Sequence, residues 1–575
     1  MPQLLSDPFL QLPTETSVQV VWFTEFAGLR HSVAYGEGLH QIAIATTTKL
    51  SRTREDQISR VKDQTQTGQV YKKPTWRDIW RHEAKVTNLS SGVRVPYCVT
   101  SVQEDGIDVT SAEFTLAPKP HPGTSLKILL TSDHQLKPMI AANLQLVVET
   151  VGRVDAVFFA GDLVNVPDRA SEWFDDNRGG AFFPCLQGRG HYELEKNGVK
   201  TLYRGGELIQ NAPLFTAIGN HEVMGRFSMN TNLNNELDDT IPRANARQLS
   251  QQNFGKGELE SILPIDERWL KDNSFNTDTY EEIFTLPKSS LGGNKYYAIS
   301  FGDVRLVVLF AANAWRTPSL AAAVKGRYSE REEDLTNPLQ WGYGQHIFEP
   351  IAKGSVQYSW LQQELNSPES RQAKYKVVML HHPPHSLGDN VVPAYTDPVQ
   401  VIDRDTNGSI KAVRYQYPLD ADYIIQDVVP LLEASGVQLV LYGHCHLWNR
   451  FVSPSGMNFL ETSNVGNSYG AAIGNRGRNV TVDSREDYVA MGDPHGLEPV
   501  MPTIAPLLDE DGEPMPYIAS NDITVFSIFE TATGTVSSYR FNTQEPGSTF
   551  SRREPPGAAL TSSKVVKFDE FKLSF

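Results

Sequence analysis

The sequence has few cysteines and no long hydrophobic run, and each absence excludes a class of protein. Three cysteines in 575 residues, Cys98, Cys185 and Cys445, cannot form a disulfide framework in a chain of this length, so packing has to stabilise the fold. No stretch approaches the roughly 18 uninterrupted apolar residues of a membrane span, so we expect no membrane segment. The N-terminus, MPQLLSDPFLQLPTETSVQV, lacks the basic start and apolar core of a signal peptide. We therefore expect a cytoplasmic protein, with other export routes left open.

Positive charge is also scarce. The chain has 52 Lys and Arg against 68 Asp and Glu, a formal net charge of -16. Because a global negative field repels polyanions, we expect no nucleic acid partner, and an anionic substrate has to be attracted by local positive charge such as bound metal. The composition, 40% hydrophobic and 21% charged, is that of an ordinary globular protein. It leaves the oligomeric state open.

The first part of the chain has the pattern of short β-strands. Val18, Val20 and Trp22 alternate with other residues, and similar alternation recurs between turn-rich breaks up to about residue 120. The stretch APKPHPG (117–123) then indicates a domain edge. Regular short strands over about a hundred residues are typical of a sandwich, so we predict an all-β sandwich over residues 1–122.

From residue 123 onward, apolar strands alternate with helical segments, which is the pattern of an α/β sheet covered on both faces. A strand pair at 522–541 is expected to complete the sheets, which gives a predicted domain over 123–545. The strands that end in polar residues are LKILLTSD (126–133), VDAVFFAGD (154–162), APLFTAIGNHE (212–222), YKVVMLHHPP (375–384) and VQLVLYGHCH (437–446).

Three stretches in this domain look inserted, near 165–210, 226–290 and 465–515. Loops of this length inside an enzyme usually form lids or substrate walls. The last residues, 546–575, are low in apolar content until VVKFDEFKLSF, and we predict that they form a C-terminal tail.

The ends of the apolar strands carry the side chains that metal-dependent phosphate chemistry needs. Carboxylates, imidazoles and amide oxygens bind divalent cations, and one shared carboxylate can hold two ions. In α/β sheets, ligands lie outside the carboxyl ends of the strands. Each motif is a weak signal alone, but five of them in this order favour one metal site. The candidate metal ligands are Asp133, Gln135, Asp162, Asn220, His381, His444 and His446.

This ordered set resembles the calcineurin-like metallophosphoesterases, whose pattern is D-x-H, G-D, G-N-H-E, H and G-H-x-H, over roughly 126–545. The preceding segments VQVVWFTEF, SVAYGEG and SAEFTLAPKP are similar to the fibronectin type III-like domain that leads purple acid phosphatases. The resemblance implies an α/β (α+β) fold, in which a two-sheet metallophosphoesterase sandwich flanked by helices follows an all-β fibronectin type III-like sandwich.

The resemblance also implies a role for each metal ligand. Asp162 would bridge two divalent ions. Asp133 and His446 would bind the first ion, and Asn220, His381 and His444 the second.

Three further residues are implied as catalytic. His221 would donate a proton to the phosphate or the leaving oxygen, Glu222 would orient His221, and Arg450 stands where the family keeps a basic residue. The alternative for Glu222 and Arg450 is a structural ion pair.

Two departures from the family pattern bear on the metals. Gln135 stands where D-x-H has its histidine, and His134 occupies the middle position, which should face away. A neutral amide oxygen weakens affinity for zinc-like ions and favours manganese, magnesium or calcium. Asn165 replaces the tyrosine that gives purple acid phosphatases their colour. We expect two divalent ions, from Mn, Zn, Fe, Mg or Ca, and no purple chromophore.

The sequence therefore predicts a hydrolase that acts on small-molecule phosphate monoesters through a metal-bridging hydroxide. With His221 as general acid, the pH profile should be bell-shaped around neutral or mildly alkaline pH. Two alternatives stay open: a phosphodiesterase or nuclease on the same site, and a non-catalytic binding module whose metal site is incomplete at Gln135.

Overall fold

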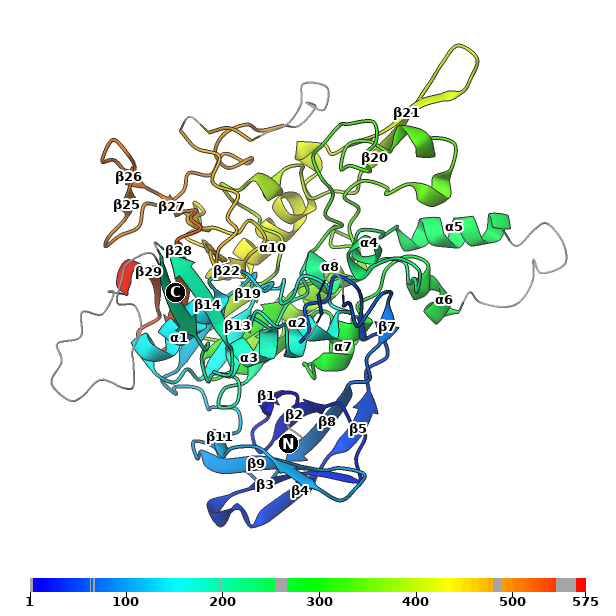
Figure 1. Ribbon diagram of the computed structural model, residues 1–575. Helices are drawn as coiled ribbons and strands as arrows, with labels where there is room; N and C mark the ends of the chain where they lie inside the picture. Colours follow the sequence, from blue (N-terminus) through cyan, green and yellow to red (C-terminus); the bar gives the residue numbers. More distant parts are fainter. Residues whose placement is uncertain are drawn as a thin grey trace.

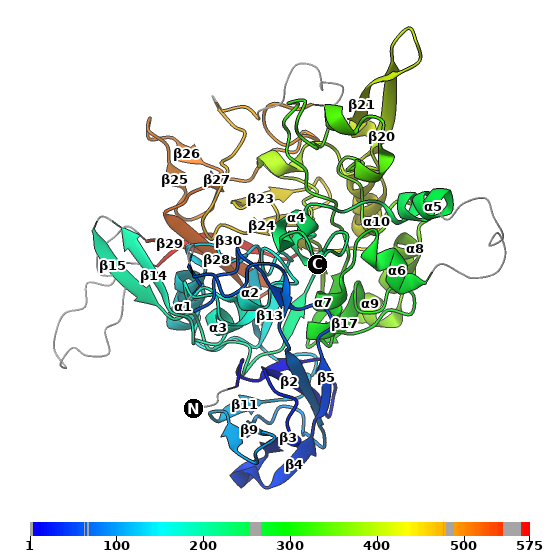
Figure 2. The same ribbon diagram turned by 45° about the vertical axis from the view of Figure 1, so that its right-hand side comes forward.

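The chain folds into an N-terminal β-sandwich and a larger α/β unit, and the sandwich is the blue part at the lower end in Figures 1 and 2. The computed structural model describes residues 4–62, 64–65, 68–196, 198–253, 266–474, 476–478, 488–543 and 565–574. Within these ranges, no helix is long and apolar enough to cross a membrane. The predicted fold class, an all-β sandwich followed by a two-sheet α/β sandwich with helices, is confirmed.

The N-terminal sandwich consists of two antiparallel sheets. One has the order β1(Phe9–Gln11), β2(Val18–Thr24), β8(Trp80–Val86), β5(Thr46–Lys49). The other has the order β10(Asp108–Thr110), β9(Val95–Val102), β3(Arg30–Tyr35), β4(Gln41–Ile44), and β11(Phe114–Leu116) also pairs with β9. The alternating residues Val18, Val20 and Trp22 are buried in the core between the sheets, as the period of two predicts.

Two mixed sheets form the α/β unit. The first has the order β16(Leu214–Thr216), β13(Ala156–Phe159), β12(Lys127–Thr131), β28(Ile523–Glu530), β29(Thr535–Asn542), β30(Val566–Lys572). The second has the order β17(Tyr297–Phe301), β18(Val304–Val308), β19(Tyr375–Met379), β22(Leu439–Tyr442), β24(Asn458–Thr462), β23(Trp448–Val452), β27(Tyr517–Ile518). In each sheet the central strands that precede the polar motifs are parallel, so their carboxyl ends lie at one edge.

The two sheets pack through aromatic side chains. The rings of Phe215 and Phe301 have centroids 5.8 Å apart, and those of Tyr375 and Phe529 are 5.1 Å apart at 86°. Such edge-to-face pairs add to the free energy of burying the rings. The packing aligns the strand ends of both sheets, which is what brings motifs from distant parts of the chain together.

Helices cover the outer faces of the sheets. α1(Ile140–Val151) lies against the first sheet, where Asn143 Nδ2 donates to the carbonyl of Val525 in β28 at 2.8 Å. α1 ends at Gly152, whose φ of 72° suits glycine because it has no Cβ. Between strands of the second sheet the chain forms α8(Val356–Leu365), α9(Pro368–Gln372), the π-helical turn η7(Ile424–Val428) and α10(Val429–Ala434).

The three predicted insertions contain short elements. The first contains α2(Ala170–Phe174), α3(Phe182–Leu186) and the hairpin β14(Tyr192–Lys196)–β15(Val199–Tyr203). The second contains α4(Leu233–Leu237), α5(Arg243–Asn253), α6(Glu267–Asp272) and α7(Asp278–Ile283), and its residues 254–265 lie outside the described residues. The third contains the hairpin β25(Leu507–Leu508)–β26(Pro514–Met515), and residues 475 and 479–487 lie outside the described ranges.

The α/β unit has two further β segments. The hairpin β20(Val399–Arg404)–β21(Ile410–Gln416) projects from the end of the molecule opposite the sandwich (Figure 1). Within the segment predicted as a C-terminal tail, β30 forms the edge strand of the first sheet, because Phe568 is buried against Trp448 of the second sheet at 4.7 Å. The rest of that segment, 546–564 and 575, lies outside the described residues.

The sandwich is attached to the α/β unit by an apolar interface and by one long excursion. Phe9 of β1 packs against Phe183 of α3, with ring centroids 5.0 Å apart, and Phe23 of β2 packs against Phe174 of α2 at the same distance. Residues 51–79, which we call the anchor segment, leave the sandwich between β5 and β8 and contain the short pair β6(Arg54–Glu55)–β7(Thr75–Trp76). In this segment, the fully buried Arg54 forms ion pairs of 2.7 Å with Asp168 and Glu236.

Candidate metal centre

The predicted metal ligands converge where the two sheets end. His381 Nε2 lies 3.3 Å from Asp162 Oδ2, 3.1 Å from Asn220 Oδ1 and 3.1 Å from His444 Nδ1. One ligand atom from each of Asp162, His381 and His444 lies within 4.8 Å of the other two, which is close enough for a single ion to contact all three. These residues come from three strands, β13, β19 and β22, so the sheet packing assembles the cluster.

Asp133 and His446 form the adjacent part of the cluster. His446 Nε2 lies 3.6 Å from Asp133 Oδ1. The other ring nitrogen, Nδ1, lies 3.2 Å from the carbonyl oxygen of Asn467, and the ring stacks on Tyr469 at 5.3 Å. Asp133 also accepts the backbone N–H of His444 at 2.9 Å. All six residues implied as ligands with the standard family roles therefore lie together.

The backbone at several ligands is in the left-handed region. The φ values are 56° at Asp133, 57° at Asp162, 82° at His444 and 56° at His446. Non-glycine residues in this region cost of order 1–3 kcal/mol each and persist only where the surrounding structure holds them. This concentration of strain at the strand ends is typical of a functional site.

Two glycines allow the loops to approach each other. A Cβ on Gly219 would lie 2.1 Å from Asp162 Oδ1, and a Cβ on Gly443 would lie 2.1 Å from Asp133 Oδ2. The glycines of G-N-H-E and G-H-x-H are therefore required by packing against the ligand carboxylates.

Glu222 binds the backbone of two ligand loops. Its carboxylate accepts the N–H groups of Asp162 at 2.8 Å, Leu163 at 2.7 Å and Gly219 at 2.8 Å, and it has no hydrogen bond to the His221 ring among the described contacts. It holds the Gly-Asp and Gly-Asn-His-Glu turns side by side. The spacing of Glu222 three residues after Gly219 is the capping-box spacing, a signal that the sequence contains.

His221 is oriented by a different group. Its Nδ1 lies 2.7 Å from the carbonyl oxygen of Asn165, and its backbone N–H donates to Asp162 Oδ1 at 3.0 Å. Because a carbonyl oxygen only accepts, Nδ1 carries the proton of that bond, which leaves Nε2 as the free ring nitrogen. Asn165, noted in the sequence only as the replacement of a tyrosine, supplies this contact.

Gln135 and His134 have different surroundings. Gln135 Nε2 donates to Asp162 Oδ2 at 2.7 Å, while Gln135 Oε1 is buried without a hydrogen-bond partner in the described chain. His134 points away, as its middle position suggested: Nε2 lies 2.9 Å from Thr131 Oγ1 and the ring packs against Phe159. Gln135 thus reaches the cluster and keeps an unpaired carbonyl oxygen.

Arg450 lies on β23 and does not line the cavity beside the cluster. Its guanidinium forms a buried ion pair of 2.9 Å with Asp569 of β30. This placement favours the structural alternative for Arg450, since β23 and β30 belong to different sheets that the ion pair connects.

The charged groups of the cluster shift one another's pKa values. Burial raises the pKa of Asp133 to about 7, although His381 opposes the rise. Burial also raises the pKa of Asp162, but His381 and His221 more than offset it and hold that pKa well below its usual range. Burial alone would lower the pKa of His381, but the charges of Asp162 and Asp133 outweigh burial and raise that pKa to about 10. A bound divalent cation would supply the positive charge that these carboxylates need, and it would displace the proton from His381, because imidazole binds a metal only in its neutral form.

A cavity of about 420 Å³ opens over the cluster. It receives Lys137 from the loop after β12, Arg60 from the anchor segment, and Trp315 and Tyr469 from other loops. Neither Lys137 nor Arg60 has an ion-pair partner in the part of the chain that the structure describes. The remaining lining residues include Asp162, Asn165, Arg169, Glu172, Asn220, His221, His444 and His446.

The fold and the cluster together define a metal-dependent phosphoric ester hydrolase, because a donor set of carboxylates, imidazoles and an amide suits divalent cations. A family model described as calcineurin-like phosphoesterase matches residues 126–447, more than half of the chain. The chain belongs to the calcineurin-like phosphoesterase family, whose sites hold divalent metal ions.

A solved structure supports the same fold. The chain is similar to a purple acid phosphatase isolated from yellow lupin (Lupinus luteus) seeds, with 13% identity, a TM-score of 0.52, and coverage of 98% of this chain and 74% of that one. No curated protein matches the chain.

Proposed function

We propose that this chain hydrolyses phosphate monoesters of small molecules, with two divalent cations bound by Asp133, Asp162, Asn220, His381, His444 and His446. The convergence of Asp162, His381 and His444 within 4.8 Å is the observation that carries the proposal. Asp162 is assigned the bridging position because its Oδ2 lies 3.3 Å from His381 Nε2 and also accepts from Gln135 Nε2 at 2.7 Å, so it contacts candidate ligands from the loops after both β19 and β12. When bound, the ions would lower the pKa of water and withdraw charge from the phosphoryl oxygens.

His221 is the proposed proton donor to the leaving oxygen. Its Nδ1 is held by the carbonyl of Asn165, and the residue lines the cavity. A side chain that is held at one ring nitrogen can present the other to substrate in a fixed direction, which general acid catalysis requires. Glu222 is assigned to holding the loops of Asp162 and Gly219 rather than to proton transfer.

Lys137 and Arg60 support monoester over diester hydrolysis. A phosphate monoester carries close to two negative charges at neutral pH, because its second pKa is about 6, whereas a diester carries one. Two cations without ion-pair partners in the described chain line the cavity and match the higher charge. They also supply local attraction in a chain whose net charge is -16.

We also propose that the catalytic unit begins near residue 123 and extends past the matched range to β30. Strands β23, β24 and β27 to β30 complete its two sheets, and all of them lie beyond residue 447.

The test combines metal quantification with paired substrates. Purified protein is loaded separately with Mn, Zn, Fe, Mg or Ca and assayed on p-nitrophenyl phosphate and bis(p-nitrophenyl) phosphate. We expect two ions per chain and a kcat/KM for the monoester higher by roughly ten-fold or more, about 1.4 kcal/mol. A preference for the diester would establish the phosphodiesterase alternative. One ion or none, with no turnover of either ester, would establish the binding module.

A further inference from the structure

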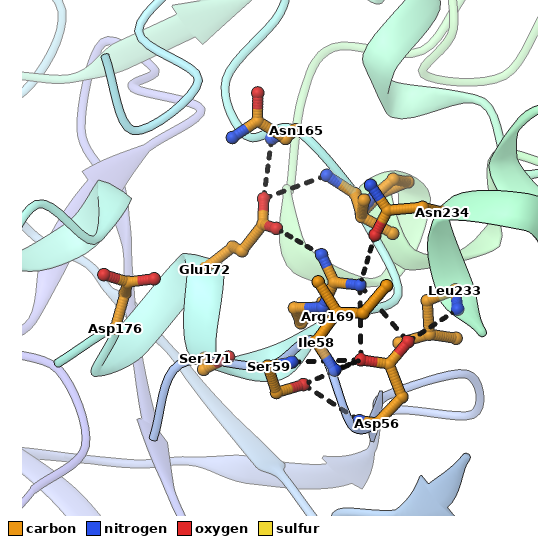
Figure 3. A network of polar contacts seen from close by, with 12 residues as sticks. Asp56, Ile58, Ser59, Asn165, Arg169, Ser171, Glu172, Asp176, Leu233 and Asn234 are labelled. Carbon is orange, nitrogen blue, oxygen red and sulfur yellow. Dashed lines mark hydrogen bonds and ion pairs between the residues drawn. The ribbon is translucent and has the colours of Figure 1, made fainter. Parts of the chain in front are cut away.

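We infer that a buried polar chain from the anchor segment, Asp56–Arg169–Glu172, positions His221 by fixing the backbone of Asn165. The inference rests on the proposed role of His221 as proton donor. It makes the N-terminal sandwich part of the catalytic apparatus, because Asp56 belongs to the excursion between β5 and β8. Figure 3 shows the chain of contacts.

The link nearest to His221 is the turn after Asp162. The carbonyl of Asn165 accepts from His221 Nδ1 at 2.7 Å. One carboxylate oxygen of Glu172 accepts the backbone N–H groups of Asn165 at 2.7 Å and Val166 at 2.9 Å. Glu172 therefore fixes the peptide units on both sides of Asn165, and with them the direction of the carbonyl that holds the imidazole.

Arg169 holds Glu172 in place. Its Nη1 donates to the second oxygen of Glu172 at 2.7 Å, so the two Glu172 oxygens divide between the turn and the guanidinium (Figure 3). Both side chains are about 5% exposed. At that burial an unpaired charge is costly, so the pair keeps one geometry rather than exchanging partners with water.

Asp56 anchors Arg169 from the sandwich side. Its two oxygens each lie 3.3 Å from Arg169 Nη2, and Asn234 Oδ1 accepts from the same nitrogen at 2.6 Å. Asp56 also accepts the N–H groups of Ile58 at 2.9 Å and Leu233 at 2.7 Å. Three buried groups of alternating charge thus connect the anchor segment and the start of α4 to the turn that carries Asn165.

Positioning of a general acid has a specific kinetic signature. An alkyl leaving group needs a proton in the transition state, whereas p-nitrophenolate is stable enough to leave without one. Disturbing the direction of His221 should therefore slow alkyl phosphate hydrolysis far more than aryl phosphate hydrolysis. Loss of folding or of metal would slow both alike.

The experiment compares Glu172→Gln and Asp56→Asn with wild type on an alkyl phosphate, glycerol 2-phosphate, and on p-nitrophenyl phosphate. We expect kcat for the alkyl ester to fall roughly ten- to a hundred-fold, as displacements of about 1 Å do, with KM and metal content close to wild type. The melting temperature of Glu172→Gln should fall, because the change leaves the buried Arg169 without a carboxylate partner. The aryl ester should change little. A His221→Ala/Glu172→Gln double variant should lose no more alkyl activity than His221→Ala alone. If Glu172→Gln does not fold, Asp56→Asn, three links from the turn, provides the same comparison.

Glu364→Gln is the matched control. Glu364 pairs with Arg305 at 2.6 Å, with side chains 12% and 11% exposed, and neither residue lines the cavity. The inference is overturned if Glu172→Gln lowers both activities equally, lowers neither, or matches Glu364→Gln. If wild type hydrolyses neither ester, the proposed function fails instead.

Discussion

The cavity is lined by two groups of residues that originate differently. The ligand loops follow β12, β13, β16, β19 and β22 and carry short motifs. The anchor segment and the turn from Asn165 to Glu172 carry no motif, yet they reach the same cavity through buried ion pairs. A candidate metal site can thus be recognised from the sequence motifs of its ligands, while its supporting contacts carry no such motif.

The two groups also differ in how they are stabilised. The ligand loops contain residues with a left-handed backbone, such as Asp162. The close packing of Gly219 and a hydrogen bond to Glu222 keep Asp162 in place. The anchor segment is held by packing and by fully buried groups such as Arg54. The backbone of the ligand loops is strained, whereas the anchor segment is held by buried ion pairs. We infer that contacts from the sandwich side help to hold the strained ligand loops in place.

The largest expected effect is at Asp162, the proposed bridging ligand. Asp162→Ala should abolish phosphomonoester hydrolysis, a loss of roughly a thousand-fold or more, because ion-mediated charge stabilisation contributes several kcal/mol. Metal analysis should show fewer ions per chain than wild type. Full metal content with normal turnover would show that Asp162 does not bridge the ions. The ligand loops would then not differ from the anchor segment in binding metal.

His221→Ala should have the next largest effect. Removal of a general acid lowers kcat roughly 10²- to 10⁴-fold, and since His221 is not an assigned ligand, metal content should remain at the wild-type value. The measurement is kcat on an alkyl phosphate together with elemental analysis of the same preparation. Parallel loss of activity and metal would mean that His221 supports the ions rather than the leaving group.

The part of the site that the sequence predicted consists of short-range signals. Asp133, Asp162, His381 and His444 each follow an apolar strand, and the carboxyl ends of neighbouring parallel strands lie at one edge whatever the loops do. Alternating apolar strands and helical segments predicted an α/β sheet, and its two-sheet form was implied by the resemblance. His134 could be set aside because successive residues of an extended segment alternate in direction.

The rest depends on contacts that no local pattern encodes. Asp56 and Arg169 are separated by 113 residues, and their pairing follows from how the sandwich docks. The contact to His221 comes from the backbone carbonyl of Asn165. Every residue type has such a carbonyl, so the sequence does not reveal the contact. The segment 546–575 was predicted as a tail because it is low in apolar residues before VVKFDEFKLSF. Its strand β30 instead joins the first sheet, and Phe568 packs against Trp448 of the second sheet.

Weakening the interface between sandwich and α/β unit should have an intermediate effect. Phe9 is fully buried against Phe183 and Phe284, so Phe9→Ala should lower the free energy of unfolding by about 3–5 kcal/mol. In chemical denaturation, wild type should unfold in one transition and the variant in two. Val33→Ala, inside the sandwich core, is the control that should keep a single transition. A single, unshifted transition for Phe9→Ala would show that the aromatic interface does not couple the two parts.

The smallest expected effect is the acid sensitivity of the sandwich itself. Burial lowers the pKa of His82 to about 3, with a further lowering from His31, whose ring stacks on it at 3.6 Å. His82 is held neutral between Thr24 and Thr47, at 2.8 Å and 2.9 Å. Because the folded-state pKa is below the unfolded value of about 6.5, the unfolded chain takes up a proton that the folded chain refuses. The stability that the neutral imidazole allows is therefore present above pH 6.5 and is lost as the pH falls toward 3.

Hydrogen exchange measured by mass spectrometry between pH 7 and 4.5, corrected for the intrinsic pH dependence, tests this sign. The peptides of β2 and β8, which hold Thr24 and His82, should lose protection on acidification in wild type. His82→Gln keeps a hydrogen-bonding side chain but cannot be protonated, so its β2 and β8 should lose less protection over the same range. If wild type and His82→Gln lose the same amount of protection on acidification, protonation of His82 is not the cause. The acid sensitivity would then lie in the carboxylates of the α/β unit and would reach the sandwich through the interface at Phe9.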